Sequence, residues 1–305
     1  MSRSDDLKKA KAEKNDEFYT QLEDIEKEMS HYTEQFKDKV VYCNCDNPEQ
    51  SMFWTYFYDN FHSLGLKELV STYYDIETAV YKTTYDGNDV VKSALQCNGD
   101  FRSQECIDVL DECDIVVTNP PFSLFREFVA TLIEHDKQFL IIGNVNSIIC
   151  KELVPLIVEN KMWLGASIHS GDRKFNVPDY YPLEAAGCGI DSDGRKFIRV
   201  KGVRWFTNLD YLARHEELVL SKMYSPEEYP TYDGYNAINV NKTKDIPMDY
   251  DGEMGVPITF IDKYNPDQFE IINLDRYING YDTHSDKLFT VNGKRLYRRI
   301  IIKRK

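Results

Sequence analysis

Residues 114–122 read DIVVTNPPF, an apolar run that ends abruptly in an Asn-Pro-Pro-aromatic sequence. The apolar residues 115–117 are typical of a buried β-strand. Pro120 and Pro121 have fixed φ angles and no N–H groups, so the loop after this strand is stiff and its carbonyl groups point outward. We therefore predict a strand that ends at Thr118, followed by a rigid loop that presents hydrogen-bond acceptors.

This loop carries the groups needed to accept hydrogen bonds from an amino group. If the Asn119 side-chain oxygen and the Pro120 carbonyl each accept a hydrogen bond from one planar amine, its lone pair is drawn out of conjugation. The lone pair is then aimed at an electrophile, and Phe122 supplies a stacking face for the base that carries the amine. The combination favours methylation of an amine. The alternative is that Pro-Pro after a strand merely turns the chain.

The composition is that of a globular protein. At 305 residues the chain is long enough for one large domain with an appendage, or for two domains. No apolar run approaches the ~20 residues that a membrane span needs, and the charged N-terminal residues do not resemble a signal peptide. Seven cysteines, an odd number without a Cys-x-x-Cys pair, indicate reduced thiols in the cytoplasm. We expect no metal site.

The charge is strongly acidic overall but basic at one end. The net charge of −14 argues against a protein that coats nucleic acid non-specifically, although it does not exclude a local basic surface. Phosphate contact and a solubilising end are both open interpretations of the last twelve residues. These contain no acid and seven bases: Lys294, Arg295, Arg298, Arg299, Lys303, Arg304 and Lys305.

The periodicity predicts helices that alternate with strands. An N-terminal helix would carry one apolar stripe, made of Leu22, Ile25, Met29, Tyr32 and Phe36. A helix over about 51–64 would end at Gly65. The other predicted elements are strands at 40–43, 69–73 and 139–142, a hairpin over 81–95, and helices up to about 110 and over 124–134.

This alternation predicts a parallel, doubly wound sheet. In such sheets ligands bind beyond the carboxyl ends of the strands, where Asp46, Asp75, Asp100 and Asn119 all fall. From about residue 168 the pattern loosens into short β-like runs such as 197–206, and we place a domain boundary near residue 210.

The acids at the strand ends suit a nucleoside ligand. Asp75 is a candidate for the ribose hydroxyls, and Asp100 for the adenine amine, with Phe101 packed on the base. Each acid alone is also typical of a helix N-cap. The first loop lacks a Gly-x-Gly sequence, which argues against a dinucleotide. S-adenosylmethionine has no phosphate and does not require such a loop.

The chain resembles the EcoRI-type adenine-specific DNA methyltransferases, a family of amino-methyltransferases with a Rossmann-like catalytic domain. The resemblance covers nearly the whole chain. It rests on DEFYTQ at 16–21, VYCNCDNP at 41–48, GDF at 99–101, NPPF at 119–122, LIIGN at 140–144, GVRWFTNLD at 202–210 and KTKDIPMDYDGEMGVPITFIDKYNP at 242–266. NPPF is shared by many amino-methyltransferases, whereas VYCNCDNP and MGVPITF are more specific. The missing glycine-rich first loop departs from the wider pattern and leaves open how Asp46 and Pro48 contact the methionine end of the cofactor.

The resemblance implies an α/β fold with a Rossmann-like, doubly wound methyltransferase sheet and a C-terminal target-recognition region. Residues 1–38 would be an N-terminal helical segment with a cofactor-contacting Phe-Tyr-Thr element. Residues 39–210 would form the S-adenosylmethionine-dependent catalytic domain, and residues 211–305 the DNA target-recognition region. The cofactor residues expected from it are Tyr19, Thr20, Asp46, Pro48, Asp75, Asp100, Phe101 and Asn119. The catalytic residues would be Asn119, Pro120, Pro121 and Phe122, and the DNA-binding residues Lys294, Arg295, Arg298 and Arg299.

The implied reaction is methyl transfer from S-adenosylmethionine to the exocyclic 6-amino group of a flipped adenine in double-stranded DNA, at a specific sequence. We expect a cytoplasmic monomer without a covalent intermediate. A cognate restriction endonuclease could act at the same site without forming a stable complex. The alternatives are amino-methylation of cytosine in DNA, methylation of a protein glutamine, and a catalytically inactive relative that binds DNA.

Overall fold

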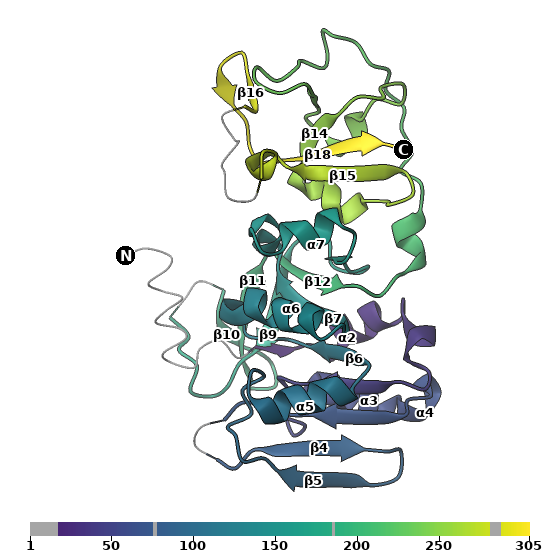
Figure 1. Ribbon diagram of the computed structural model, residues 1–305. Coiled ribbons are helices and arrows are strands. Elements are labelled where there is room, and N and C mark those ends of the chain that lie inside the picture. Colours follow the sequence, from purple (N-terminus) through teal and green to yellow (C-terminus); the bar gives the residue numbers. More distant parts are fainter. Residues whose placement is uncertain (1–17, 76–77, 185–186, 281–287) are drawn as a thin grey trace. The chain divides into compact units, whose positions relative to one another are not determined.

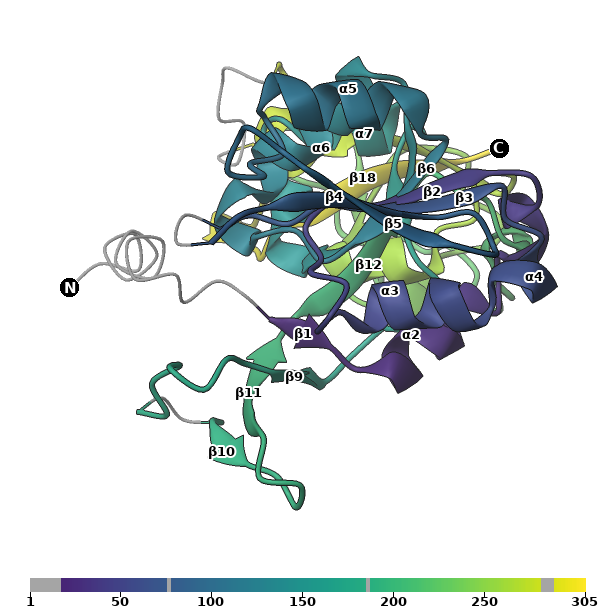
Figure 2. The same cartoon turned by 90° about the horizontal axis from the view of Figure 1, so that it is seen from below.

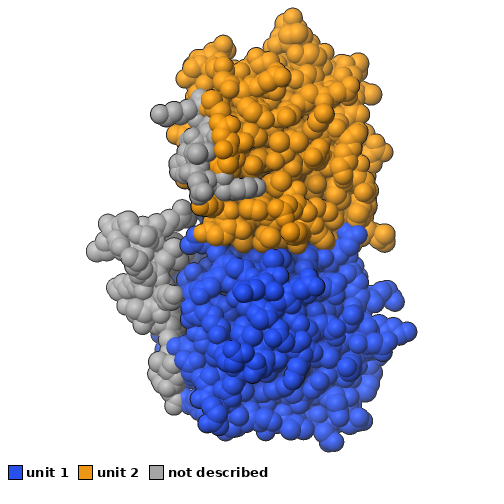
Figure 3. Space-filling model, in the orientation of Figure 1, with its two compact units in different colours: residues 1–147, 165–210 blue, residues 148–164, 211–305 orange. Residues whose placement is uncertain are grey.

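The computed structural model describes residues 18–75, 78–184, 187–280 and 288–305 (Figure 1). Asp16 and Glu17, the first two residues of the quoted DEFYTQ segment, lie outside these residues. The chain divides into two compact units (Figure 3): unit 1 contains residues 1–147 and 165–210, and unit 2 contains residues 148–164 and 211–305. Unit 2 thus includes residues 148–164, which the expected domains assign to the catalytic part. No helix among the described residues is long and apolar enough to cross a membrane.

Unit 1 is built around one large sheet. Its four central strands are parallel, and the outer strands β5, β4 and β12 run antiparallel to their neighbours. All residues of β2 and β6 are buried, because central strands of a parallel sheet are covered on both faces. The mixed α/β class is therefore confirmed. Seven strands of unit 1 follow one another in the order β5 (Val90–Ala94), β4 (Tyr81–Tyr85), β3 (Glu68–Ser71), β2 (Val40–Cys43), β6 (Ile115–Thr118), β7 (Gln138–Asn144), β12 (Val203–Thr207).

Helices cover both faces of this sheet, as Figure 2 shows. α5 (Gln104–Glu112) and α6 (Phe125–Glu134) lie on one side, and α2 (Leu22–Met29), α3 (Met52–Asp59) and α4 (Phe61–Leu64) lie on the other. The order of the strands reverses between β2 and β6, since the chain first adds β3 on one side of β2 and later β6 and β7 on the other. This reversal leaves a crevice at the carboxyl ends of β2 and β6.

The predicted helix over 51–64 is two helices. Ser51 caps α3, because its hydroxyl oxygen accepts hydrogen bonds from the backbone N–H groups of Phe53 and Trp54. The α-helix is interrupted at Asn60, whose side chain donates to the Tyr56 carbonyl at 2.9 Å and so competes with the backbone ladder. Gly65 ends α4 in the left-handed conformation, as expected, with φ of 65°.

Four of the five residues of the predicted N-terminal apolar stripe are buried and Leu22 is partly buried, but the stripe is not one helix. Ile25, Met29, Tyr32 and Phe36 are all at most 1% exposed. The α-helix ends at Met29, and Thr33–Phe36 form a 3₁₀ turn. Residues spaced by three share one face in both kinds of helix, so spacing alone does not separate them.

A second, smaller sheet of unit 1 carries the N-terminal element. Its order is β1 (Tyr19–Thr20), β9 (Asp172–Asn176), β11 (Lys196–Lys201), β10 (Gly189–Ile190), and all its pairs are antiparallel. The β-like run predicted at 197–206 is therefore two strands, β11 and β12, which belong to different sheets. They are joined at Gly202, where φ is 75°.

Unit 2 is built on a four-stranded sheet and a short hairpin. The basic C-terminal run is not a loose end, because β18 lies between β14 and β15 and its residues Ile300, Ile301 and Ile302 are buried. The sheet order is β13 (Ile238–Asn239), β14 (Met254–Pro257), β18 (Arg299–Arg304), β15 (Phe269–Leu274). The remaining elements are α7 (Val154–Val158), β8 (Trp163–Leu164) and the hairpin of β16 (Thr290–Val291) and β17 (Lys294–Arg295).

Candidate active site

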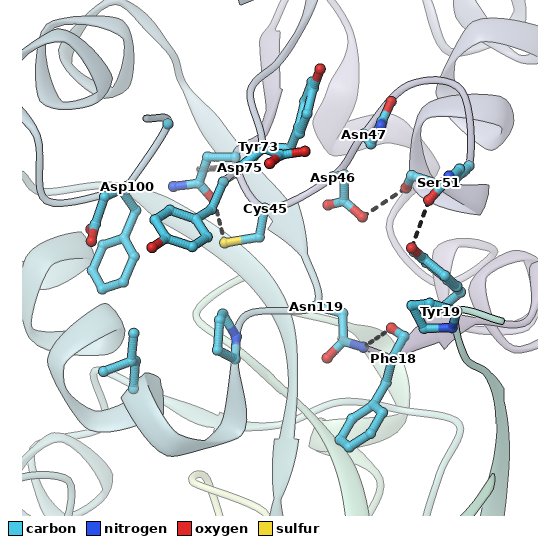
Figure 4. A pocket seen from close by; sticks show the side chains of 18 of the residues that line it. Phe18, Tyr19, Cys45, Asp46, Asn47, Ser51, Tyr73, Asp75, Asp100 and Asn119 are labelled. Atoms are coloured by element: carbon cyan, nitrogen blue, oxygen red, sulfur yellow. Dashed lines mark hydrogen bonds between the residues drawn. The ribbon is translucent and has the colours of Figure 1, made fainter. Parts of the chain in front are cut away.

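A pocket of about 440 Å³ in unit 1 lies beyond the carboxyl ends of β2, β3 and β6 (Figure 4). These are the strand ends from which the sequence predicts ligand contacts. The predicted residues that line the pocket are Tyr19, Asp46, Asp75, Asp100, Phe101, Asn119 and Pro121. The structure thus brings together residues that are more than a hundred positions apart in the chain, from Tyr19 to Pro121.

Four residues expected at the site do not line this pocket. Pro120 and Thr20 are buried, and the hydroxyl of Thr20 has no hydrogen-bond partner among the described residues. Pro48 and Phe122 are partly buried in the same two loops as the lining residues. Their expected roles remain predictions.

The Asp46 side chain links the loop after β2 to the end of β6, at the point where the strand order reverses. Its carboxylate accepts a hydrogen bond from the Ser51 hydroxyl at 2.7 Å and from the Thr118 hydroxyl at 2.5 Å. Its backbone carbonyl accepts one from the Ser71 hydroxyl of β3. Burial raises the pKa of the Asp46 carboxyl to about 6, and the bonds from Thr118 and Ser51 oppose that shift. One acid therefore sets the spacing of three strand ends.

Asn119 is held in one orientation. Its side-chain Nδ2 donates to the backbone carbonyl of Phe18 at 2.7 Å, as Figure 4 shows. Its Oδ1 is buried and has no hydrogen-bond partner among the described residues. An unpaired buried acceptor is costly and rare in folded proteins, so such an atom at the wall of a pocket points to a ligand that donates a hydrogen bond.

The loops after β3 and before α5 meet at a second corner of the pocket. The Asp75 N–H donates to the Asn98 carbonyl at 3.0 Å, and the Asp75 carboxylate accepts from the Thr78 hydroxyl at 2.9 Å. Asp100 is paired with Arg102, whose Nε and Nη2 reach its two oxygens at 2.8 and 2.5 Å. This two-point pair fixes the plane of the Asp100 carboxylate.

Aromatic rings form the remaining walls of the pocket. Phe101 is buried and its ring packs edge-on against Phe128 of α6, with 5.0 Å between centroids. Tyr73 and Tyr74 follow β3 directly, and Tyr74 is 45% exposed. These flat apolar surfaces suit a heterocyclic base.

The pocket offers neither a reactive thiolate nor a metal site in the part of the chain that the structure describes. Burial raises the pKa of the Cys45 thiol well above its usual value, so the sulfur that lines the pocket is protonated at neutral pH. No three His, Cys, Asp or Glu side chains of the described residues form a group that could hold a metal ion.

The four basic residues expected to bind DNA fall into two classes. Lys294 and Arg295 form β17 and are exposed. Arg298 lies 3.6 Å from an oxygen of the buried Asp275. Arg299 is itself buried, and its guanidinium donates to the side-chain oxygen of Asn239 at 3.2 Å. Burial thus favours a structural role for Arg299.

Several lining residues were not predicted as site residues. Asn44, Cys45, Asn47 and Gln50 lie in the VYCNCDNP segment and its continuation, so the motif contained this signal. Pro178 and Tyr180 come from the loop after β9, where the sequence shows no periodicity that would place them. Phe18 and Gly99 also line the pocket and belong to the cofactor-contacting Phe-Tyr-Thr element and to the GDF segment. The unpredicted lining residues are Asn44, Cys45, Asn47, Gln50, Ser51, Tyr73, Tyr74, Arg102, Ser123, Leu124, Pro178 and Tyr180.

Comparisons with known proteins show the family to which the chain belongs. A family model described as adenine-specific methyltransferase EcoRI matches residues 6–305. The type II methyltransferase M.EcoRI of Escherichia coli is 49% identical, over 98% of this chain and 96% of that protein. M.MgeORF184P of Mycoplasma genitalium and M.MpnI of Mycoplasma pneumoniae are each 40% identical, over 97% of this chain and 98% and 97% of theirs. No solved structure matches the chain. The chain belongs to the EcoRI family of adenine-specific methyltransferases.

Proposed function

We propose that this enzyme transfers a methyl group from S-adenosylmethionine to the exocyclic 6-amino group of adenine in double-stranded DNA. The observation that carries the proposal is the buried, unpaired Oδ1 of Asn119 at the pocket wall, beside the carboxyl end of β6. An amino group is the donor that this oxygen lacks. The family to which the chain belongs is adenine-specific, which supports adenine as the bearer of that amino group.

The pocket suits S-adenosylmethionine. Its volume is within the usual range for small-molecule sites, and it lies at the reversal of the strand order of a sheet that we infer to be Rossmann-like and doubly wound. Asp75 would accept hydrogen bonds from the ribose hydroxyls, and Asp100 from the adenine amine of the cofactor. S-adenosylmethionine, when bound, supplies the methyl group as a strongly electrophilic sulfonium.

The protein's own part in the reaction is to orient the amine. Asn119 Oδ1 and the Pro120 carbonyl would each accept one hydrogen bond from the target amino group, which turns the nitrogen lone pair toward the methyl group. The new C–N bond forms as the C–S bond breaks, and the surplus proton leaves to water. An adenine inside a duplex is out of reach of this loop, so the base must be flipped. Stacking on Phe122 would offset part of the unstacking cost, which is a few kcal/mol.

The hairpin of β16 and β17 is a candidate DNA contact in the proposed C-terminal recognition region. Its turn residues Asn292 and Gly293 have positive φ angles of 51° and 71°, as a tight hairpin turn requires. The Asp233 carboxylate accepts hydrogen bonds from both of their N–H groups, at 3.1 and 2.8 Å. A hairpin pinned in this way would present the exposed Lys294 and Arg295 to phosphates or to a groove edge with little loss of entropy.

Salt dependence tests this hairpin assignment. Each phosphate contact contributes about 0.9 to the slope of log affinity against log salt concentration for duplex DNA. We expect Lys294→Ala and Arg295→Ala each to lower that slope by about this amount, whereas Lys161→Ala at an exposed position outside the hairpin leaves it unchanged. Equal slopes for all three variants would remove the hairpin from the DNA interface.

The reaction itself is tested with the purified protein, duplex DNA of mixed sequence and S-adenosylmethionine labelled in its methyl group. Digestion to nucleosides and mass spectrometry should find the label in N6-methyladenine, and Asn119→Ala should abolish it. Label in N4-methylcytosine would support the cytosine alternative. Unlabelled DNA, together with labelled glutamine in a parallel reaction that contains cell-extract protein, would support the protein-substrate alternative. The absence of both labelled product and calorimetric binding of S-adenosylmethionine would favour an inactive DNA-binding relative.

The proposed reaction also suggests the oligomeric state, the location and the partner of this enzyme. Each methylation event modifies one strand, so a monomer suffices and no two-fold symmetry is needed. We propose a cytoplasmic enzyme that acts beside a restriction endonuclease specific for the same DNA sequence, with no stable complex between the two.

A further inference from the structure

We propose that Phe18 is a positioning residue for methyl transfer: its backbone carbonyl fixes the Asn119 amide, and its ring packs against the aromatic residue of the same catalytic loop. This inference rests on the proposed function, in which Asn119 binds the target amine. It adds a residue from the start of the described chain whose contribution is a main-chain atom and a packing contact.

The hydrogen bond to Phe18 determines which way the Asn119 amide points. The distance from the side-chain nitrogen to the Phe18 carbonyl oxygen is 2.7 Å. The opposite orientation would place two oxygen acceptors at that separation, and neither has a hydrogen to share. Phe18 therefore holds the amide with its NH₂ group occupied and its oxygen on the other side.

The side-chain oxygen of Asn119 takes no part in the bond to Phe18, and it is the acceptor that the proposed reaction needs. Asn119 Oδ1 is buried without a partner among the described residues, in a residue that lines the pocket. An untethered side chain would turn to satisfy this acceptor elsewhere. The Phe18 carbonyl blocks that turn and keeps the acceptor aimed before the substrate arrives, which is how preorganised polar groups lower a barrier.

The ring of Phe18 supports the same loop from the side. Its centroid lies 5.6 Å from that of Phe122, edge-on, and 5.9 Å from that of Phe175 in β9. The next residue, Tyr19, pairs with Asn176 of β9, and Gln21 donates to the Asn176 side chain at 2.7 Å. Phe18 is thus tied to the smaller sheet and transmits the rigidity of that sheet to the catalytic loop.

Replacing Tyr19 by its α-hydroxy acid tests the role of the carbonyl in the full-length protein. The substitution turns the peptide bond between Phe18 and Tyr19 into an ester, whose carbonyl is a weaker acceptor, while every side chain is kept. The matched control is the α-hydroxy acid of glutamine at position 21, which makes the same chemical change two bonds further on. Two readouts are needed, the side-chain NH₂ resonances of Asn119 in protein labelled with ¹⁵N-asparagine, and the single-turnover rate of methyl transfer.

We expect the ester after Phe18 to move the Asn119 NH₂ resonances upfield and to slow methyl transfer about tenfold, with S-adenosylmethionine affinity unchanged. The control ester should leave the Asn119 resonances in place and the rate of methyl transfer within about twofold of the wild type. Unmoved resonances, or a slower rate that weaker S-adenosylmethionine binding explains, would overturn the proposal.

Phe18→Leu and Phe18→Ala test the ring and remain informative if the ester protein does not fold. Both keep the carbonyl, but only leucine fills much of the space beside Phe122. We expect Phe18→Ala to lower the rate and Phe18→Leu to restore most of it. Equal rates for the two variants would contradict the ring's role. If the Asn119 resonances respond to the ester but the unmodified protein methylates no DNA, the proposed function fails while the positioning contact stands.

Discussion

The Asp46 carboxylate accepts a 2.5 Å hydrogen bond from the hydroxyl of Thr118, 72 residues later in the chain. Thr118 is the last residue of β6 and directly precedes Asn119. Asp46 also accepts from Ser51, the N-cap residue of α3. The position of the catalytic loop relative to the loop after β2 therefore depends on one buried acid.

The buried carboxyl of Asp46 makes stability depend on pH. Its pKa is raised from 3.8 to about 6 in the folded protein, so the folded state binds the proton more tightly than the unfolded state. Folding is then favoured at low pH, and this contribution is lost as pH rises from about 4 to about 6. Relative to Asp46→Asn, the free energy of unfolding should fall by up to about 3 kcal/mol over that window.

Urea unfolding of both proteins between pH 4 and pH 8 measures this difference, because all other titrating groups cancel in the comparison. A difference that stays constant over this range would mean that the pKa of Asp46 is ordinary in the folded protein, and a difference that rises with pH would mean that its pKa is lowered.

Removing the Thr118 hydroxyl should weaken both stability and catalysis. In Thr118→Val the ionised Asp46 loses one of its two hydroxyl partners, which costs about 1–3 kcal/mol of unfolding free energy at pH 7.5. The loss should shrink at pH 4.5, where Asp46 is protonated. Because Asn119 follows Thr118, the turnover rate should also fall, whereas Thr118→Ser, which keeps the hydroxyl, should retain most of both. Equal behaviour of the valine and serine variants would contradict this account.

Glu28 should be a large contributor to the stability of unit 1. Its side chain is fully buried, and its carboxylate accepts hydrogen bonds from the Tyr32 hydroxyl at 2.8 Å and from the N–H groups of Ala166 and Ser167, each at 2.7 Å. Glu28→Ala leaves these buried donors without a partner, so we expect a loss of about 3–5 kcal/mol in urea unfolding. Glu26→Ala, on the exposed face of the same helix, should change stability by less than about 0.5 kcal/mol.

Gly99 should tolerate no side chain. Its φ is +75°, and a Cβ there would lie 1.8 Å from the Tyr73 carbonyl oxygen. Both residues line the pocket, so Gly99→Ala should push the Tyr73 loop away and weaken S-adenosylmethionine binding at least about tenfold by calorimetry. The matched control is Gly194→Ala, whose φ is +79° but whose Cβ meets nothing within 4 Å. If both variants bind the cofactor like the wild type, the close contact at Gly99 has no role in the pocket.

The sequence was most informative where local pattern and tertiary burial agree. The sequences of β2 and β6 are apolar because both faces of the central sheet are covered. Polar residues that follow such parallel strands lie at the carboxyl edge of the sheet, where ligands bind. Asp46, Asp75, Asp100 and Asn119 line one pocket for that reason.

What the sequence did not reveal depends on contacts between distant segments. The bond from Asn119 to Phe18 spans 101 residues, and the pairing of β1 with β9 brings Tyr19 to Asn176. No periodicity encodes either contact. The role of the basic C-terminal run is hard to predict for a related reason. Arg299 is the first residue of a strand at the centre of a sheet, and its guanidinium donates a hydrogen bond inside unit 2. Charge alone does not separate a phosphate contact from a buried hydrogen-bond donor.

Single-molecule sequencing of DNA from cells that express this protein, beside cells that express Asn119→Ala, tests the central proposal most directly. We predict N6-methyladenine at one short sequence motif in the first sample and unmodified adenine at that motif in the second. Equal adenine methylation in both samples would contradict the role of Asn119. The absence of any modified adenine, with both proteins soluble and folded, would contradict DNA adenine methylation itself.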